Sequence, residues 1–239
     1  MAIEVFNRYE NKYILSNDKY EILIKHLYDY MEDDVHNKDQ SFYTISNIYY
    51  DTMENYLIRR SIEKPIYKEK LRLRSYGTCN LDSLVYLELK KKYNGIVNKR
   101  RTTIKLMDAY NFVENREKPF LWPYINKQVV NEIDYFLQLY EVKPQLFLSY
   151  ERRALFGKND KDFRITFDRN IKTRRYDLGL HYGVYGTPLL DADTWLMEIK
   201  LSKATPMELT RLLSQYKIYP TSFSKYGTEY KKQFGKADT

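Results

Sequence analysis

Basic side chains recur at every second position in several short stretches of this sequence. Lys70, Arg72 and Arg74 follow one another in this way, with leucines between them. Because side chains alternate across a β-strand, such a set lies on one face of the strand. Cations gathered where water is partly excluded need anions, since their mutual repulsion rises as the local dielectric falls. Phosphate is the expected partner, because arginine binds its oxygens in a bidentate manner and lysine supplies a compact charge.

At least six strand-like segments carry polar or charged residues on one face, most of them with apolar residues on the other. The sets are Arg8, Glu10 and Lys12; Lys70, Arg72 and Arg74; Glu88 and Lys90; Lys99 and Arg101; Tyr150 and Arg152; Arg164 and Thr166; and Glu198 and Lys200. The set with Tyr150 and Arg152 follows Leu146 and Leu148 on the same face, so the sequence leaves the facing of that strand open. The few acids, Glu10, Glu88 and Glu198, are candidates for holding a divalent metal that bridges phosphate oxygens.

The residues from Leu84 to Lys105 predict a β-hairpin that presents one of these charged faces. Asn94-Gly95 lies between two extended runs, and this pair favours a two-residue turn because both residues tolerate positive φ. Such a turn fixes the register and places Lys90 opposite Lys99. Like charges directly opposite each other are destabilising unless something anionic lies there. The same register places Glu88, Lys92, Arg101 and Thr103 on that face, and Val85, Leu87, Leu89 and Ile104 on the core-facing side.

The remaining chain is expected to combine strands with amphipathic helices. Predicted strands cover Val5–Leu15, Phe42–Tyr50, Tyr67–Tyr76, a run from Gln145, Asp162–Asp168 and Trp195–Leu201. Predicted helices cover Asp18–Met31, Met53–Ile62, Met107–Glu117, Gln128–Tyr140, Pro206–Tyr216 and a last short helix to Phe234, while Glu32–Ser41 is expected to be a loop. The apolar stripes of the helices need burial, and the apolar strand faces are the natural place for it. The charged faces then point inward, and a closed barrel would be lined with lysine and arginine.

Length and composition are those of a single globular domain, which we place at residues 1–239. Hydrophobic residues make up 43% of the chain, and no linker or repeat divides it. The formal net charge of +8 permits nucleic acid, an anionic membrane or a phosphorylated small molecule as partner. The single cysteine, Cys79, fits a reducing compartment. Because the sequence has no long apolar run and no signal peptide, we expect a soluble, cytoplasmic protein without a transmembrane segment.

A series of short motifs runs in order from about Phe6 to Phe234. They are Arg8-x-Glu10-x-Lys12-Tyr13, Tyr49-Tyr50-Asp51-Thr52, Lys70-x-Arg72-x-Arg74-x-Tyr76, Glu88-x-Lys90, Tyr150-x-Arg152, Arg164-x-Thr166-x-Asp168, Glu198-x-Lys200-Leu201 and Ser222-Phe223-Ser224-Lys225-Tyr226. Each motif is weak by itself. As an ordered set, they resemble the polyphosphate-polymerase domain of the vacuolar transporter chaperone family, which belongs to the triphosphate tunnel metalloenzymes.

This resemblance implies an α+β fold with a closed, eight-stranded antiparallel β tunnel, lined with basic residues and flanked by helices. It also implies transfer of the ATP γ-phosphate onto a growing inorganic polyphosphate chain, with Mn²⁺ or Mg²⁺ as cofactor. Glu198 matches the metal-binding glutamate, and we add Glu10 as a second metal candidate. The positions that match phosphate contacts are Lys12, Arg72, Arg74, Lys90, Arg152, Arg164, Ser224 and Lys225. Further substrate-binding candidates on the charged faces are Lys70, Lys99, Arg101, Tyr150 and Lys200.

Two positions depart from the pattern of these enzymes. Tunnel triphosphatases open with Glu-x-Glu-x-Lys, whereas here the first acid is replaced by Arg8. This change removes a carboxylate that could bind metal or activate water, so it favours a polymerase over a hydrolase. Ser222 stands where another basic residue is expected, which would weaken phosphate binding at one end of the tunnel. The regulatory and transmembrane regions of eukaryotic relatives are missing, so we expect the catalytic domain alone.

Two other functions compete with the polymerase. A tunnel triphosphatase acting on inorganic triphosphate or nucleoside triphosphates would use the same fold and most of the same residues. A non-catalytic module that binds polyphosphate or RNA would need no metal, and Glu198 would then be a structural partner of a lysine. Nucleic acid is the weaker version, because the basic residues are spread over alternating strand faces rather than gathered in one surface helix or loop.

Overall fold

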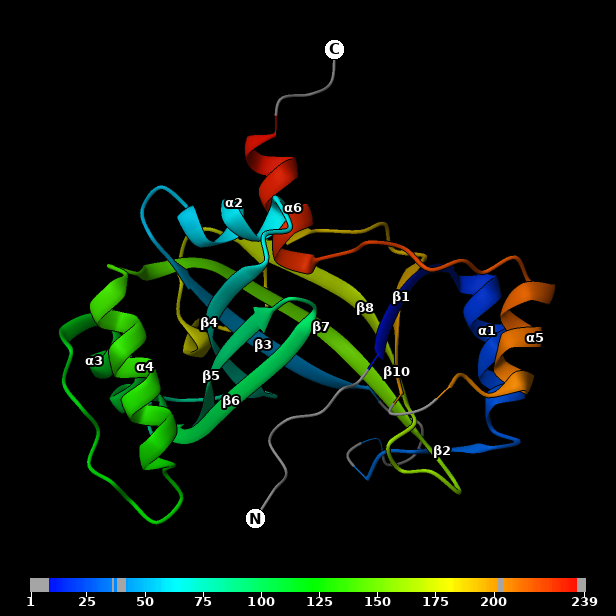
Figure 1. Cartoon of the computed structure of the whole chain (residues 1–239), viewed down its shortest axis with the longest axis horizontal. Coiled ribbons are helices and arrows are strands. Elements are labelled where there is room, and N and C mark those ends of the chain that lie inside the picture. The colour runs from blue at the N-terminus through cyan, green and yellow to red at the C-terminus, as the bar shows by residue number, and fades with distance from the viewer. Residues whose placement is uncertain (1–8, 36, 38–41, 202–203, 236–239) are drawn as a thin grey trace.

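The computed structural model describes residues 9–35, 37, 42–201 and 204–235. Within these ranges the chain forms one large, curved, antiparallel sheet and six α-helices (Figure 1). Eight strands follow one another in the order β1-β10-β8-β7-β3-β4-β5-β6, while the short β2 and β9 pair with β7 and β8. The predicted α+β class and the antiparallel arrangement of eight main strands are therefore confirmed.

The strands lie close to the predicted segments, with two differences. Their bounds are β1 (Tyr9–Ser16), β2 (Met31–Asp33), β3 (Tyr43–Asp51), β4 (Tyr67–Tyr76), β5 (Leu84–Tyr93), β6 (Ile96–Lys105), β7 (Lys143–Gly157), β8 (Arg164–Arg174), β9 (Thr187–Pro188) and β10 (Thr194–Leu201). β8 continues beyond Asp168 because it pairs along β7. β2 lies where the sequence predicts the end of a helix and a loop, because Met31 pairs with Gly157 at the far end of β7. The predicted first residues of β1, from Val5, lie outside the described residues.

The β5–β6 hairpin has the predicted turn and register. Asn94 and Gly95 both have positive φ, at 44° and 87°, as the two-residue turn requires. Lys90 pairs with Lys99, and Glu88 pairs with Arg101. The predicted like-charge pair therefore exists in the folded protein.

The helices are α1 (Asn17–Leu27), α2 (Tyr56–Ile62), α3 (Leu106–Asn115), α4 (Lys127–Leu139), α5 (Met207–Gln215) and α6 (Lys225–Phe234), with a 3₁₀ turn at Leu180–Tyr182. The prediction that the first helix reaches Met31 is wrong, because α1 ends at Leu27. α2 begins later than predicted. The carboxylate of Asp51 accepts hydrogen bonds from the N–H groups of Leu57 at 2.8 Å and Ile58 at 2.9 Å, and so ties the first turn of α2 to β3.

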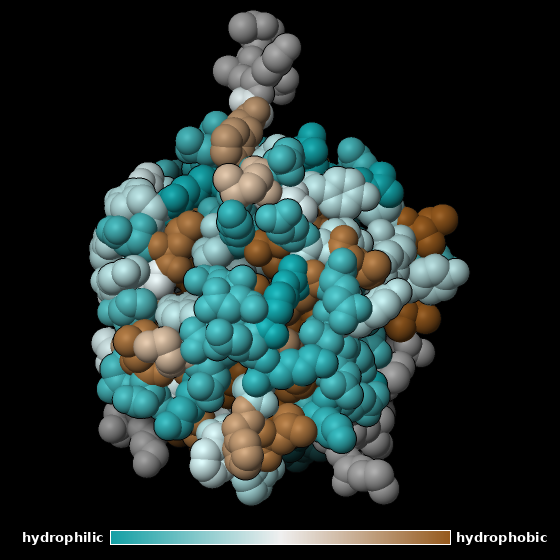
Figure 2. All heavy atoms as spheres, turned by 90° about the vertical axis from the view of Figure 1, so that its left-hand side faces the viewer, coloured by the Kyte–Doolittle hydropathy of each residue, from teal (hydrophilic) through white to brown (hydrophobic). Residues whose placement is uncertain are grey.

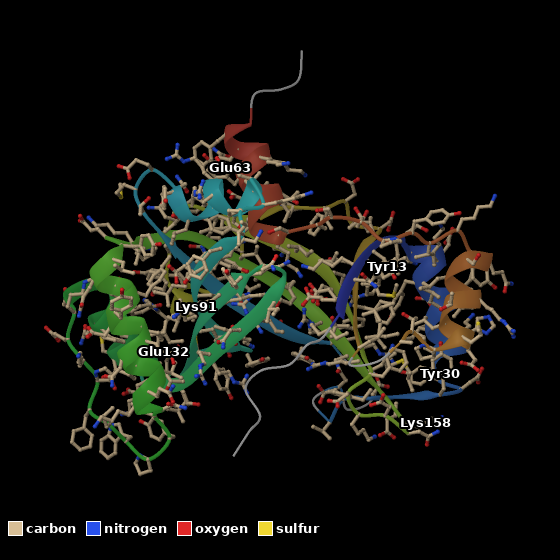
Figure 3. All side chains as sticks on the ribbon, in the orientation of Figure 1. Tyr13, Tyr30, Glu63, Lys91, Glu132 and Lys158 are labelled. Atoms are coloured by element: carbon tan, nitrogen blue, oxygen red, sulfur yellow. The ribbon has the colours of Figure 1, made fainter. Side chains whose placement is uncertain are left out.

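Two helix pairs cover the outer face of the sheet at its two ends (Figure 1). α3 and α4 lie over β4, β5 and β6, where Phe136 and Leu87 belong to one buried cluster. α1 and α5 lie over β1, β8 and β10, where Leu23 and Met197 belong to a second cluster. Tyr13 lies on the side of β1 that faces α1 (Figure 3). Each such side chain contributes about 1.5–3 kcal/mol when it is fully buried, so the outer clusters hold the sheet in its curve.

The third helix pair, α2 and α6, covers part of the opposite, inner face. Ile58 of α2 and Tyr226 of α6 belong to a buried cluster with Leu146, Leu148 and Leu196 of the sheet. This packing explains the mixed pattern that the sequence shows along β7. Leu146, Leu148 and Tyr150 of β7 face inward under these two helices, and Arg152 follows them on the same face.

The sheet is not closed within the described residues. β1 and β6 are the two ends of the strand order, and no pairing joins them there. A cavity of about 710 Å³ separates the two edges, with Glu10, Asn11 and Lys12 of β1 on one side and Val97 of β6 on the other. The eight strands of the predicted tunnel are present, but the closed barrel is not seen. Arg8, whose identity departs from the triphosphatase pattern, lies outside the described residues.

Charged side chains on the outer face of the hairpin are engaged by α4. Glu132 forms ion pairs with Lys91 at 3.9 Å and with Arg100 at 3.4 Å (Figure 3). The surface on this side is mostly hydrophilic, and its hydrophobic side chains form separate patches (Figure 2). Among the described residues, no helix combines the length and the apolar composition that crossing a membrane would require.

Candidate phosphate-binding site

Strand alternation places the predicted site residues on one curved surface, which we call the inner face. Lys12 lies opposite Glu198, which in turn lies opposite Thr166, and Arg72 lies opposite Glu88. The charged residues and Tyr150 that share this face are Glu10, Lys12, Lys68, Lys70, Arg72, Arg74, Glu88, Lys90, Lys92, Lys99, Arg101, Tyr150, Arg152, Arg164, Asp168, Glu198 and Lys200. Cations clearly outnumber carboxylates on this surface, and Lys225 of α6 adds another from outside the sheet.

Glu88 organises the first group of cations. Its carboxylate is 1% exposed and accepts a 3.0 Å hydrogen bond from Nε of Arg72, which also contacts it through Nη2. Nζ of Lys99 lies 2.8 Å from the other oxygen, Oε1. Nε of Arg74 lies 4.0 Å from Oε2, the oxygen that Arg72 contacts. Burial alone would raise the pKa of Glu88, but the charges of Arg72, Arg74 and Lys99 lower it well below its usual value. Glu88 is thus an ionised anchor for three cations.

Polar side chains of β3 and β7 fix the two arginines of this group. Arg72 donates to the hydroxyl of Tyr49 at 3.2 Å. Arg74 donates to Oδ1 of Asn47 at 3.0 Å and to the hydroxyl of Tyr150 at 3.2 Å. Sequence analysis included Tyr49 in a motif but gave it no role in the site, and it did not select Asn47, although alternation along β3 places both on the charged side of the sheet. Burial would raise the pKa of Tyr49, but Arg72 and Lys70 lower it to about 8.

Asp168 organises a second group and was also missed as a site acid. It is fully buried and receives two hydrogen bonds from Arg152, from Nε at 2.6 Å and from Nη2 at 2.8 Å. Nζ of Lys225 donates to the same carboxylate at 2.5 Å. Burial would raise the pKa of Asp168, but Arg152 and Lys225 lower it. The sequence signal that could have identified Asp168 is its alternation with Arg164 and Thr166, which places all three on the inner face. We call these two groups (Arg72, Arg74, Arg152, Glu88 and Asp168) the arginine centre.

Glu198 lies beside the arginine centre and is surrounded by lysines. Its oxygens lie 3.0 Å from Nζ of Lys200, 3.4 Å from Nζ of Lys12 and 3.8 Å from Nζ of Lys225. Lys12 also lies 3.4 Å from Glu10, so one ammonium lies between two carboxylates. Burial would raise the pKa of Glu198, but these lysines lower it well below its usual value. Glu198 is therefore ionised, as a metal ligand must be.

The residues around Glu198 fit a site for a hard divalent cation. Glu10 and Glu198 offer carboxylate oxygens, and the buried hydroxyl of Thr166, opposite Glu198, has no hydrogen-bond partner among the described residues. Mg²⁺ and Mn²⁺ prefer such oxygen ligands, and Mg²⁺ is often held by one or two carboxylates together with substrate phosphates. The described part of the chain contains no cluster of three or more acidic, histidine or cysteine side chains that could hold a metal. Phosphate oxygens and water would complete the shell. Glu88, the third sequence candidate, is instead enclosed by arginines and lysine.

One end of the inner face opens into the 710 Å³ cavity between β1, the hairpin turn, α2 and α6. Besides Lys12, the cavity is lined by six lysines that we call the lysine end: Lys64, Lys68, Lys70, Lys90, Lys92 and Lys231. Lys68 donates to the carbonyl of Ser61 at 3.0 Å. Within the described ranges, the side chains of Lys64, Lys90, Lys92 and Lys231 make no hydrogen bond or ion pair. Burial, together with the neighbouring lysines, lowers the pKa of Lys70 to about 8. These ammonium groups are available for an anion.

Both serines singled out by the motif analysis line this cavity. The hydroxyl of Ser224 accepts the N–H of Gly227 at 3.2 Å, so it is also the cap of α6. Ser222 adds no charge, but Lys92, which the hairpin register places on the charged face, provides a cation in the same cavity. Lys64 and Lys231, which sequence analysis did not select, provide two more.

The other end of the inner face carries tyrosines and arginines, and we call it the tyrosine end. The ring centroids of Tyr43 and Tyr76 are 6.1 Å apart, and those of Tyr76 and Tyr86 are 5.7 Å apart. The guanidinium of Arg101 lies 4.6 Å from the centroid of Tyr86. Arg164, on the same end of the sheet, lies 3.4 Å from Asp34. Arg164 also lies opposite Lys200, so it connects this end with the residues around Glu198, whereas Arg101 lies across the sheet on β6.

Comparison with known proteins supports this description of the fold. The family model of the VTC domain matches residues 7–234. A proposed adenylate cyclase from Bacillus halodurans has a similar structure, with 15% identity, a TM-score of 0.56, and coverage of 97% of this chain and 99% of that one. Another from Vibrio parahaemolyticus has 15% identity, a TM-score of 0.53, and coverage of 94% and 98%. At such identities the likeness concerns the fold alone. No curated protein matches the sequence.

Proposed function

The chain belongs to the VTC domain family, within the triphosphate tunnel superfamily, and on that premise we propose that it is a polyphosphate polymerase. In this proposal, it transfers the γ-phosphate of ATP onto a growing chain of inorganic polyphosphate. Residues 1–239 would act as one catalytic domain. The gap between β1 and β6 would be part of the substrate path, so that the curved sheet works as a tunnel.

The observation that carries the proposal is the continuous series of cations along the inner face. Several lysines of the cavity make no hydrogen bond or ion pair with any described residue, and arginines with fixed orientations follow them toward the opposite end of the sheet. A series of this length suits a linear polyanion better than a single phosphate. Arg72, Arg74 and Arg152 would hold the transferred phosphate and its neighbours through paired N–H groups. Lys12, Lys90, Arg164 and Lys225 would neutralise charge along the chain, with Lys70, Lys99, Arg101, Lys200, Tyr150 and Ser224 as further contacts.

Phosphoryl transfer depends mainly on position and on electrostatic stabilisation, both of which this surface would provide. Lys12, Lys200 and Lys225 would turn from Glu198 toward bound phosphate, and this would free the carboxylates of Glu198 and Glu10 for a metal. A bound Mn²⁺ or Mg²⁺ would neutralise the charge that develops on the phosphate oxygens.

The ionisation of the carboxylates favours a polymerase over a hydrolase. The pKa values of Glu10, Glu88, Asp168 and Glu198 are all lowered because neighbouring cations outweigh the effect of burial. A carboxylate with a lowered pKa is a weak general base for water. The terminal oxygen of a polyphosphate chain is already ionised and needs no strong base to attack phosphorus.

The test is incubation of the purified protein with ATP and Mn²⁺ or Mg²⁺, resolved on a gel stained for polyphosphate. We expect a ladder that lengthens with time and is lost in both Arg72→Ala and Glu198→Gln. Lys91→Ala is the matched control, because Lys91 neighbours Lys90 on β5 but faces α4. Orthophosphate without a ladder would replace the proposal by a triphosphatase. Binding of polyphosphate without either product would leave a binding module.

A further inference from the structure

The tyrosine end differs in chemistry from every other part of the inner face. Tyr43, Tyr76 and Tyr86 come from three adjacent strands, β3, β4 and β5, and each has a ring centroid within about 6 Å of a neighbour's. Aromatic side chains on sheets are usually buried in a core. Here Tyr76 is 45% exposed, and Tyr43 and Tyr86 are half-buried. Their ring faces are therefore partly accessible from the end of the substrate surface.

The tyrosines deeper on the same face have another role. Tyr49 and Tyr150 direct their hydroxyls toward Arg72 and Arg74 and so orient the guanidinium groups. The rings at the tyrosine end instead make contacts through their faces and edges. The Tyr76–Tyr86 pair is nearly perpendicular at 86°, and Arg101 covers one face of Tyr86. This arrangement of flat rings and guanidinium groups is one on which nucleobases stack.

We infer that the tyrosine end binds the nucleobase of the nucleotide donor by stacking on Tyr76 and Tyr86. This inference rests on the proposed function for the identity of the donor. It assigns a direction to the inner face, with the nucleoside at the tyrosine end, the transferred phosphate at the arginine centre and the polyphosphate chain toward the lysine end. Because every base has a flat aromatic face, the site should discriminate weakly among ATP, GTP and CTP.

The spacing along the strands agrees with this direction. Tyr76 follows Arg74 by two residues on the same face of β4, a separation of roughly 7 Å. Tyr86 lies directly opposite Arg74 on β5. A nucleotide whose phosphates contact Arg72 and Arg74 thus has aromatic rings within the reach of one ribose. At the lysine end, the residues that line the cavity include one aromatic ring, Phe223, among many lysines.

The test compares ATP with inorganic tripolyphosphate, which has the same chain of three phosphates but no nucleoside. Dissociation constants are measured by titration calorimetry for the full chain and for Tyr76→Ala and Tyr86→Ala. Each variant should bind ATP about tenfold more weakly, the change that corresponds to loss of about 1.4 kcal/mol of stacking. Binding of tripolyphosphate should stay within about twofold. Tyr76→Phe and Tyr86→Phe keep the ring and should retain affinity for ATP.

Tyr135→Ala is the control, since Tyr135 lies on α4 and is 60% exposed. Equal weakening of both ligands would overturn the inference, because the tyrosines would then support the fold. Unchanged ATP affinity in the alanine variants would overturn it as well. The assay measures binding rather than turnover, so its result is separate from that of the polymerase test. If ATP binding depends on Tyr76 and Tyr86 but the gel shows no polyphosphate, the base site is supported and the polymerase proposal fails.

Discussion

The lysine end and the arginine centre carry the same sign of charge but hold it in different ways. In the arginine centre, Arg72 and Arg152 are fixed by carboxylates, and Arg74 is fixed by Asn47 and Tyr150. At the lysine end, most ammonium groups have no partner among the described residues and face a cavity of about 710 Å³. One region is oriented before any ligand arrives, whereas the other can adjust to it.

On the proposed function, this difference matches two tasks in one polymerase reaction. A reacting phosphate has to be held in a defined position, and a planar guanidinium with fixed hydrogen bonds does this well. A growing chain has to move after each addition, and flexible point charges bind it without fixing its register. On that proposal, arginine serves catalysis and lysine serves chain binding on this surface.

The largest effect is expected when arginine and lysine are exchanged between the two regions. Arg72→Lys keeps the charge but loses the fork that contacts Glu88 and Tyr49 together, so kcat/KM should fall by about a hundredfold, in the range for removal of one oriented donor. Lys92→Arg, at the lysine end, should stay within about twofold. Initial rates of ATP consumption with polyphosphate present would measure both. Similar losses in the two variants would mean that the two regions do not differ in function.

Because Glu88 loses a partner in Arg72→Lys, the variant also needs a stability measurement. Urea unfolding separates a loss of fold from a loss of orientation. If added tripolyphosphate restores the stability of Arg72→Lys to that of the unchanged protein but its rate of ATP consumption stays low, Arg72 serves to orient the phosphate.

A second way to sharpen the comparison uses pH. Arginine stays charged at all accessible pH values, whereas the pKa of Lys70 lies at about 8 and that of Tyr49 also at about 8. As pH rises above 8, Lys70 loses its positive charge and Tyr49 gains a negative one. Each of the two groups should therefore lower polyphosphate affinity by up to about tenfold per pH unit between pH 8 and 10. Lys70→Arg should reduce this dependence, and titration of binding at constant ionic strength would measure it.

The same two groups change stability in the opposite direction. Both pKa values are lower in the folded protein than the ordinary values of 10.5 for lysine and 10.0 for tyrosine. Between pH 8 and 10 the unfolded chain then binds more protons, so the contribution of these groups to stability rises with pH. If polyphosphate affinity falls while the contribution of Lys70 and Tyr49 to stability rises, loss of the fold does not explain the weaker binding. If affinity and stability fall together between pH 8 and 10, the lowered pKa values of Lys70 and Tyr49 do not account for the change in binding.

The smallest expected effect is at the rim of the lysine end. Lys64→Ala or Lys231→Ala should weaken binding of long polyphosphate by about two- to threefold, because exposed single charges contribute little. Each change should also lower the slope of log affinity against log salt concentration by roughly one. Tripolyphosphate, which is short, should bind almost unchanged. Lys127→Ala, on the exposed start of α4, should have no effect on either ligand.

Most of the fold could be predicted from the sequence because its signals are local. The Asn94-Gly95 turn fixes the register of β5 and β6, and alternation along β4 places Arg72 and Arg74 on one face. β2 could not be predicted in this way. Its three residues, starting at Met31, become a strand only because the end of β7 offers an edge, and no local pattern carries that information.

The candidate site was predictable in its cations and less so in what holds them. Arg72 and Arg74 were selected because three basic residues in alternation are unusual, and Lys12 and Arg152 because they match motif positions of the family that the sequence resembles. Asn47 and Asp168 were not selected, because a neutral amide or a single acid on a strand has many ordinary explanations. Their importance depends on cross-strand neighbours. Arg74 and Arg152 meet them only after β3, β4, β7 and β8 have paired.

The pairing of β1 with β10 has a consequence for the order in which the strands of the sheet come together. Lys12 is synthesised well before Glu198, because most of the other strands lie between β1 and β10 in the sequence. The hairpin of β5 and β6, by contrast, consists of neighbours in sequence and closes a short loop. Since long loops close late, the β1–β10 pair should be among the last parts of the sheet to form. A polyanion that binds only the completed pair would stabilise it by mass action, and would thereby act as a folding ligand for the protein that binds it.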